Sequence, residues 1–153
     1  MSPRQVTEMN ARHDLTFDLA AFVASVAKSA PEIRSIWLVG SRGNGTARPD
    51  SDWDLIAFGA EETFQNLQAA LHLHRKDVDF LIVTSGTRFR AAWGASGKAG
   101  DLIEWEWSEV SENLATYTET KWIEREDGSG WLSKQRRGTR VWPIFNAPQS
   151  ISP

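Results

Sequence analysis

The chain has 153 residues, of which 41% are hydrophobic and 24% charged, a length and composition that predict one globular domain. A net charge of −3 and a pI near 5.6 argue against a protein that coats nucleic acid. The absence of cysteine excludes disulfides and cysteine-ligated zinc. Neither an apolar leader nor a bilayer-length apolar run is visible in the sequence, so we expect a soluble, cytoplasmic protein.

Helical and strand-like patterns alternate through the first half of the chain. Residues 1–12 are expected to form a flexible N-terminus, and apolar residues at helical spacing predict a helix from about residue 14 to 30. Strands are predicted where β-branched and aromatic residues gather, at 33–39, 52–58 and 78–83. A second helix is predicted between the last two strands, over residues 61–73. This order predicts an α/β (α+β) sandwich with a mixed central sheet and flanking helices.

The pattern changes after Thr84. Residues 85–100 hold four of the eleven glycines, with only isolated aromatic residues between them. Alternation predicts strands at 102–107 and 140–145, and Asp-Gly-Ser-Gly at 127–130 is typical of a turn. A separate domain of about fifty residues would be marginally stable. We therefore expect residues 86–153 to form a β-rich, Trp-containing C-terminal extension packed on a core of residues 13–85.

The most informative stretch joins the first two predicted strands. One apolar run ends in Gly40-Ser41, and the next begins with Asp52-Trp53-Asp54. Gly40 lets the backbone approach a phosphate closely, and free N–H groups with the Ser41 hydroxyl can face an anion. Asp52 and Asp54 point to the same face of a strand, whereas Trp53 points into the core. Two such carboxylates repel one another without a cation, and their hard oxygen atoms suit Mg²⁺.

At these residues the chain resembles the DNA polymerase beta-like nucleotidyltransferase superfamily, and above all its minimal nucleotidyltransferase (MNT) branch. The signature of that branch is Gly-Ser, a spacer of roughly ten residues, then Asp-x-Asp. The residues that fit it are Gly40, Ser41, Gly45, Ser51, Asp52, Asp54 and Leu55. The family's third carboxylate corresponds to Asp79, which directly precedes an apolar run, and Asp77 on the same strand face is the competing choice. The resemblance covers about residues 14–85 and implies the nucleotidyltransferase fold.

The resemblance also implies an activity. Such an enzyme transfers an NMP, most often AMP in the MNT branch, from an NTP to a hydroxyl group and releases pyrophosphate. The implied catalytic and metal-binding residues are Asp52, Asp54 and Asp79, in a two-metal site for Mg²⁺ in which Mn²⁺ could substitute. The implied nucleotide-binding residues are Gly40, Ser41, Arg42, Gly45 and Ser51. In the MNT branch the acceptor is often a tyrosine of a partner HEPN-type toxin, and other relatives modify antibiotics.

Several side chains have a simpler interpretation beside the functional one. Arg42 and Arg48 could neutralise phosphate charge or could be solvated loop residues. His72 and His74 point apart at a helix end, which favours surface histidines over metal ligands. The tail that holds five of the eight tryptophans also carries cations that could help to stack bases and hold phosphates: Lys134, Arg136, Arg137 and Arg140. A run of glutamates precedes these cations, so a hairpin with tryptophans on the core is favoured.

Three other functions stay open on the sequence. The fold could persist as a non-catalytic or weakly catalytic antitoxin or regulatory module that acts by contact alone. The acceptor could be a small antibiotic-type molecule, although the short chain favours a protein acceptor over a drug. A nucleic acid acceptor is disfavoured by the acidic pI. Clustered carboxylates are not needed for folding, which favours catalysis over contact alone.

Overall fold

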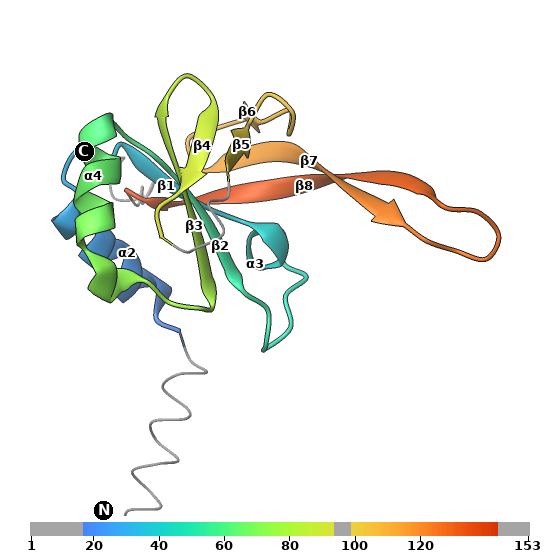
Figure 1. Ribbon diagram of the computed structural model, residues 1–153, viewed down its shortest axis with the longest axis horizontal. Helices are drawn as coiled ribbons and strands as arrows, with labels where there is room; N and C mark the ends of the chain where they lie inside the picture. The colour runs from blue at the N-terminus through green and yellow to red at the C-terminus, as the bar shows by residue number, and fades with distance from the viewer. Residues whose placement is uncertain (1–16, 94–98, 144–153) are drawn as a thin grey trace, which may run out of the picture.

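One mixed sheet runs through residues 17–93 and 99–143, the part of the chain that the computed structural model describes (Figure 1). The helices in these residues are α2 (Leu19–Ser29), α3 (Gly40–Asn44) and α4 (Glu61–Ala69), with a 3₁₀ helix, η1, at Leu71–Leu73. Its strands are β1 (Ser35–Val39), β2 (Trp53–Phe58), β3 (Val78–Ser85), β4 (Arg88–Ala91), β5 (Ala99–Asp101), β6 (Ser108–Glu109), β7 (Leu114–Ile123) and β8 (Gly130–Trp142). The sheet order is β5-β4-β3-β2-β1-β8-β7-β6.

The C-terminal strands continue the sheet of the first half on both sides. Strands β2 and β3 are parallel, as the α4 crossover between them requires, and the neighbouring pairs are antiparallel. On one side β4 and β5 follow β3, and on the other β8 pairs directly with β1. The predicted mixed sheet with flanking helices and a β-rich C-terminal extension is confirmed. The extension shares the sheet of the core, since β8 completes the hydrogen bonding of β1.

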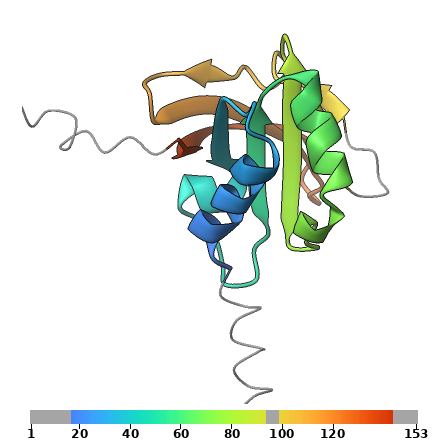
Figure 2. The same cartoon turned by 90° about the vertical axis from the view of Figure 1, so that its left-hand side faces the viewer.

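Helices α2 and α4 lie side by side on one face of the sheet (Figure 2). The N–H of Ala21 donates to the Asp18 carboxylate at 3.0 Å, which caps the first turn of α2. Phe22 and Val26 of α2 and Leu67 of α4 are buried, and they belong to one apolar cluster with the strand residues that face them. Burying this face fixes the register of the strands, and therefore also fixes which side chains face the opposite side.

The opposite face carries a second apolar cluster. Ile56, Leu81 and Val83 of the central strands are buried there together with Tyr117 of β7. Trp105 and other partly buried aromatic side chains of the extension pack against this cluster. The extension therefore covers the part of the sheet that the helices leave open.

The prediction of a strand at 102–107 is wrong. The N–H groups of Glu104, Trp105 and Glu106 each donate to the carbonyl three residues earlier, at 3.0–3.2 Å, so this segment is a series of turns. The Asp101 carboxylate accepts the N–H of Ile103 at 2.9 Å and fixes the first turn. The alternation arose because Leu102, Trp105 and Trp107 pack against the sheet, whereas Glu104 and Glu106 between them face solvent.

Other boundaries also differ from the prediction. The described part of the first helix begins at Leu19, α4 ends at Ala69, and residues 85–100 contain β4 and part of β5. The turn predicted at 127–130 is confirmed as the loop of the β7–β8 hairpin, although β8 begins earlier than the predicted strand. The expected flexible N-terminus at 1–12 and the end of the strand at 144–145 lie outside the described residues. Among those described, no helix is long and apolar enough to cross a membrane.

The prediction that the tail tryptophans face the core is right for Trp105, Trp107 and Trp142 and wrong for Trp122 and Trp131. The last two are paired across the hairpin with ring centroids 5.3 Å apart, and they are 50% and 71% exposed. Figure 1 shows the reason: the distal half of the hairpin projects away from the rest of the protein, so it has no core to face.

Candidate functional site

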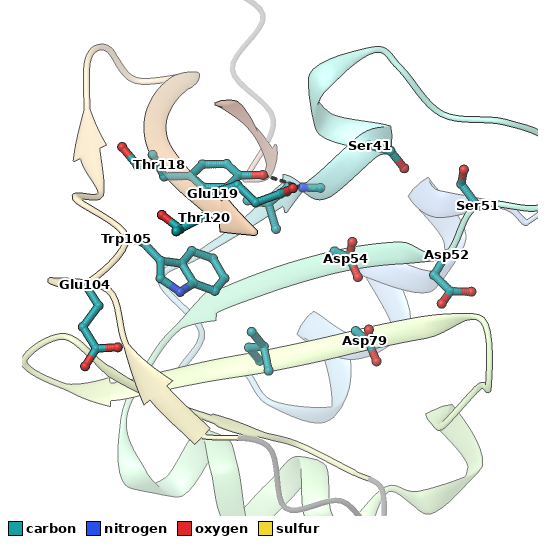
Figure 3. Close-up of a pocket in the computed structure, with 14 residues that line it drawn as sticks. Ser41, Ser51, Asp52, Asp54, Asp79, Glu104, Trp105, Thr118, Glu119 and Thr120 are labelled. Carbon is teal, nitrogen blue, oxygen red and sulfur yellow. Dashed lines mark hydrogen bonds between the residues drawn. The ribbon is translucent and has the colours of Figure 1, made fainter. Parts of the chain in front are cut away.

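Three aspartate side chains line one pocket of about 720 Å³ on the sheet face opposite α2 and α4 (Figure 3). Asp54 of β2 and Asp79 of β3 are directly paired in the parallel register, so their side chains leave the sheet on the same face. Asp52 lies just before β2 and reaches the pocket from the end of the preceding loop. The structure therefore brings together the three acids that the sequence singled out.

Gly40 packs against one of these acids. It begins α3 with a φ of 68°, in the left-handed region, and a Cβ atom built on it would collide with the carboxylate of Asp54. This closeness follows from the pairing of β1 with β2, in which Val39 lies opposite Asp54. The chain can turn beside the carboxylate only because residue 40 has no side chain.

Two hydroxyl side chains line the pocket, that of Ser41 in α3 and that of Ser51 in the loop between α3 and β2. Ser51 also closes its own turn, since its Oγ accepts the N–H of Arg48 at 2.8 Å and its N–H donates to the Arg48 carbonyl at 3.0 Å. Gly45 is not among the lining residues. It ends α3 in the left-handed conformation, and its N–H donates to the Ser41 carbonyl. Its position indicates a role in the shape of the loop.

Arg42 also lies outside the pocket lining. Its guanidinium donates to the main-chain carbonyls of Pro49 at 3.2 Å and of Ser51 at 3.0 Å. The same group lies over the Trp53 ring, 4.3 Å from its centroid. These contacts hold the loop against β2, so the structure does not bring Arg42 to the position expected of a nucleotide-binding residue.

The structure separates Asp77 from Asp79. Asp77 receives two hydrogen bonds from the Arg75 guanidinium, at 2.8 and 2.9 Å, which lower the pKa of its carboxyl group. Asp79 lines the pocket and Asp77 does not. Of the two candidates for the third carboxylate, Asp79 is the one that the fold places beside Asp54.

Tyr117 is a pocket residue that the sequence did not reveal. Its hydroxyl oxygen accepts the N–H of Gly40 at 2.7 Å, a contact between residues 77 positions apart (Figure 3). Burial raises the pKa of this hydroxyl, and the nearby carboxylates of Glu119 and Asp54 raise it further. No local sequence pattern around Tyr117 indicates this contact. The other lining residues from the extension are Glu104, Trp105, Thr118, Glu119 and Thr120.

The residues that line the pocket carry five carboxylates and no lysine, arginine or histidine. Glu119 forms ion pairs with two neighbouring cations, Lys121 at 2.9 Å and Arg136 at 3.3 Å. Nowhere in residues 17–93 and 99–143 do three acidic or histidine side chains converge closely enough to hold a metal by themselves. The donors are nevertheless all oxygen, the type that Mg²⁺ prefers, and Mg²⁺ commonly takes one or two carboxylates with phosphate oxygens and water.

The polymerase beta nucleotidyltransferase family matches residues 23–99, just over half of the chain, and the chain belongs to this family. The matched segment contains Gly40, Ser41 and the three pocket aspartates. It ends before Trp105 and Tyr117, which come from the extension.

Two solved structures resemble parts of the chain. A candidate nucleotidyltransferase from Sulfolobus solfataricus is 24% identical, with a TM-score of 0.36, over 44% of this chain and 64% of that one. A toxin–antitoxin structure with AMP-PNP is 23% identical, with a TM-score of 0.32, over 52% of this chain and 76% of that one. The chain thus spans less than two thirds of the length of the Sulfolobus protein. No match was found among curated proteins.

Proposed function

We propose that this protein is a metal-dependent nucleotidyltransferase that transfers an NMP from an NTP to a hydroxyl acceptor and releases pyrophosphate. One observation carries the proposal: Asp54 and Asp79, paired across β2 and β3, share a pocket with Asp52 beside the Gly40-Ser41 turn. Membership of the polymerase beta nucleotidyltransferase family makes this the expected place for the reaction.

The charge of the pocket supports a requirement for a divalent cation. A triphosphate that entered it would meet carboxylates and no cationic side chain among the lining residues. Asp52, Asp54 and Asp79 would hold Mg²⁺ or Mn²⁺ together with phosphate oxygens and water, since their oxygen atoms suit hard cations. When bound, the metal supplies neutralisation of the triphosphate charge and a lower pKa for the acceptor hydroxyl.

The chain's own residues position the nucleotide. The N–H of Gly40 already donates to Tyr117, so we assign the phosphate contacts to the Ser41 and Ser51 side chains and to the N–H groups that follow Gly40. Arg42 keeps the loop that carries Ser51 against β2. Chemistry of this kind depends mainly on positioning and charge neutralisation, so few side chains are required.

For the donor and acceptor we propose ATP and a protein hydroxyl, such as a tyrosine of a partner HEPN-type toxin. The resemblance of the Gly-Ser and Asp-x-Asp motifs to the MNT branch supports this choice.

The test is a melting titration of the protein with each of the four NTPs, with and without Mg²⁺. Binding at a hundredfold excess over Kd adds about 2.7 kcal/mol to stability, which shifts the melting temperature measurably. We expect a metal-dependent rise that is largest with ATP, followed by release of pyrophosphate once an acceptor is supplied. No shift with any nucleotide at millimolar concentration would contradict the proposal and favour a module that acts by contact alone.

A further inference from the structure

We propose that Trp105 forms the wall against which the nucleobase of the donor NTP stacks. This inference rests on the proposed function and adds a specificity-determining residue to it. Trp105 belongs to the extension and lies outside the segment that matches the nucleotidyltransferase family, residues 23–99. The base would thus be bound by a part of this chain that the family match does not include.

The pocket has two chemically different ends. Figure 3 shows the aspartates and the two serines at one end, and Glu104, Trp105 and Thr118 at the other. The first end offers oxygen ligands for metal and phosphate. The second offers an aromatic ring with hydroxyl and carboxylate groups beside it, which can stack a flat base and bond to its polar edges. A volume of about 720 Å³ is within the range of pockets that enclose one small ligand.

Trp105 is held in place before any ligand arrives. Its ring packs on Phe89 at 5.1 Å and on Tyr117 at 5.5 Å between centroids. The main-chain carbonyl of Trp105 accepts the N–H of Thr118 at 2.6 Å, and its main-chain N–H donates to the Leu102 carbonyl at 3.1 Å. The side chain remains only partly buried and lines the pocket. A ring that is already held by its neighbours and still lines the pocket loses little entropy when a base stacks on it.

Tyr117 connects the two ends of the pocket. Its ring packs on Trp105, and its hydroxyl accepts the N–H of Gly40 beside Asp54. Because one residue contacts both the aromatic wall and the turn next to the acids, the spacing between these two ends is fixed. A nucleotide with its triphosphate at the acids therefore has its base directed toward Trp105.

Calorimetry with two probes tests the proposal: Mg²⁺ with ATP, and Mg²⁺ with inorganic tripolyphosphate, which has no base. The wild type should bind ATP more tightly than tripolyphosphate. Trp105→Ala should weaken ATP binding by roughly tenfold to a hundredfold, the range expected for one stacked base. It should leave tripolyphosphate binding unchanged. Trp105→Phe, which keeps an aromatic ring, should retain most of the affinity for ATP.

Trp131→Ala is the matched control, because this tryptophan is 71% exposed on the hairpin and lines no part of the pocket. It should change neither affinity. Equal wild-type affinity for the two probes would overturn the stacking role, even if Trp105→Ala failed to fold. If Trp105→Ala lowered the affinity for both probes equally, the stacking role would also be overturned. If the wild type bound neither ATP nor tripolyphosphate, the proposed function itself would be refuted.

Discussion

Asp54 and Asp79 lie directly opposite one another on the parallel strands β2 and β3, and both face the pocket. Neighbouring strands are about 4.8 Å apart, so two carboxylates in register at this distance repel one another when both are ionised. A divalent cation with a polyphosphate would relieve this repulsion. The register therefore favours a ligand-bound state over the ligand-free protein.

Asp79→Asn should abolish the metal-dependent part of nucleotide binding while the fold is retained. We expect the affinity for Mg²⁺ with ATP to fall by at least the roughly 10- to 100-fold that loss of even a supporting residue costs a metal site. The melting temperature of the ligand-free protein should rise slightly, since one of two like charges is removed. Calorimetry and thermal melting measure both effects.

Asp77→Asn is the control for that experiment, because it makes the same chemical change on the same segment outside the pocket lining. It should leave the affinity for Mg²⁺ with ATP unchanged. Equal losses in Asp77→Asn and Asp79→Asn would show that general charge, and not the pocket, determines binding.

Gly40→Ala should be much more disruptive than Gly45→Ala, although both glycines have a positive φ, 68° and 78°. Each substitution should lower the stability by about 1–2 kcal/mol, because an L-residue is strained in the left-handed region. A Cβ at Gly45 meets nothing within 4 Å, whereas one at Gly40 meets the Asp54 carboxylate. We expect an additional 1–3 kcal/mol at Gly40, about the cost of overpacking, together with loss of nucleotide binding.

Chemical denaturation of the two variants measures this difference. Equal destabilisation would mean that the turn moves freely away from Asp54, which would remove the close approach from the description of the site.

The sequence predicts the parts of this site that are local in the chain. The run from Gly40 to Asp54 and the acid at Asp79 are each contained in one strand–turn unit, so residue types and spacing indicate their arrangement. The choice between Asp77 and Asp79 needed the structure, because the sequence pattern puts both on the same strand face. In the structure Asp77 is bound by Arg75, and of the two only Asp79 lines the pocket. The catalytic roles of Asp52, Asp54 and Asp79 stay a prediction.

The extension could not be predicted to the same depth, because its interactions join distant residues. Pairing of β8 with β1 and the bond from Gly40 to Tyr117 leave no local pattern. At 102–107 the pattern itself was ambiguous. Alternate aromatic residues fit a strand with one buried face, and they fit equally well a series of turns in which Trp105 packs beneath a sheet.

Acid should remove a small part of the stability through Asp77. The hydrogen bonds from Arg75 lower the folded-state pKa of this carboxyl group. Its contribution to the free energy of unfolding is therefore present above the unfolded-state pKa, about 3.9, and is lost as the pH falls through the folded-state pKa. The pair is about 37% exposed on each side, so we expect less than about 1 kcal/mol. Asp77→Asn should lose this contribution at pH 7 and match the wild type at the acid end. A constant difference from pH 7 to pH 2 would contradict the assignment.

Alkali should act through Tyr117, and the chain offers an unusually direct measurement because this is its only tyrosine. Burial, with the charges of Glu119 and Asp54, raises the folded-state pKa, so ionisation followed by ultraviolet absorbance should have its midpoint above the ordinary value of about 10. The corresponding stability is present below the unfolded pKa and is lost as the pH rises toward the folded one. Tyr117→Phe should cost about 1–3 kcal/mol at neutral pH, since it leaves the Gly40 N–H without its acceptor. A midpoint at or below 10 in the folded protein would mean that the hydroxyl is not held between the aromatic wall and the Gly40 turn.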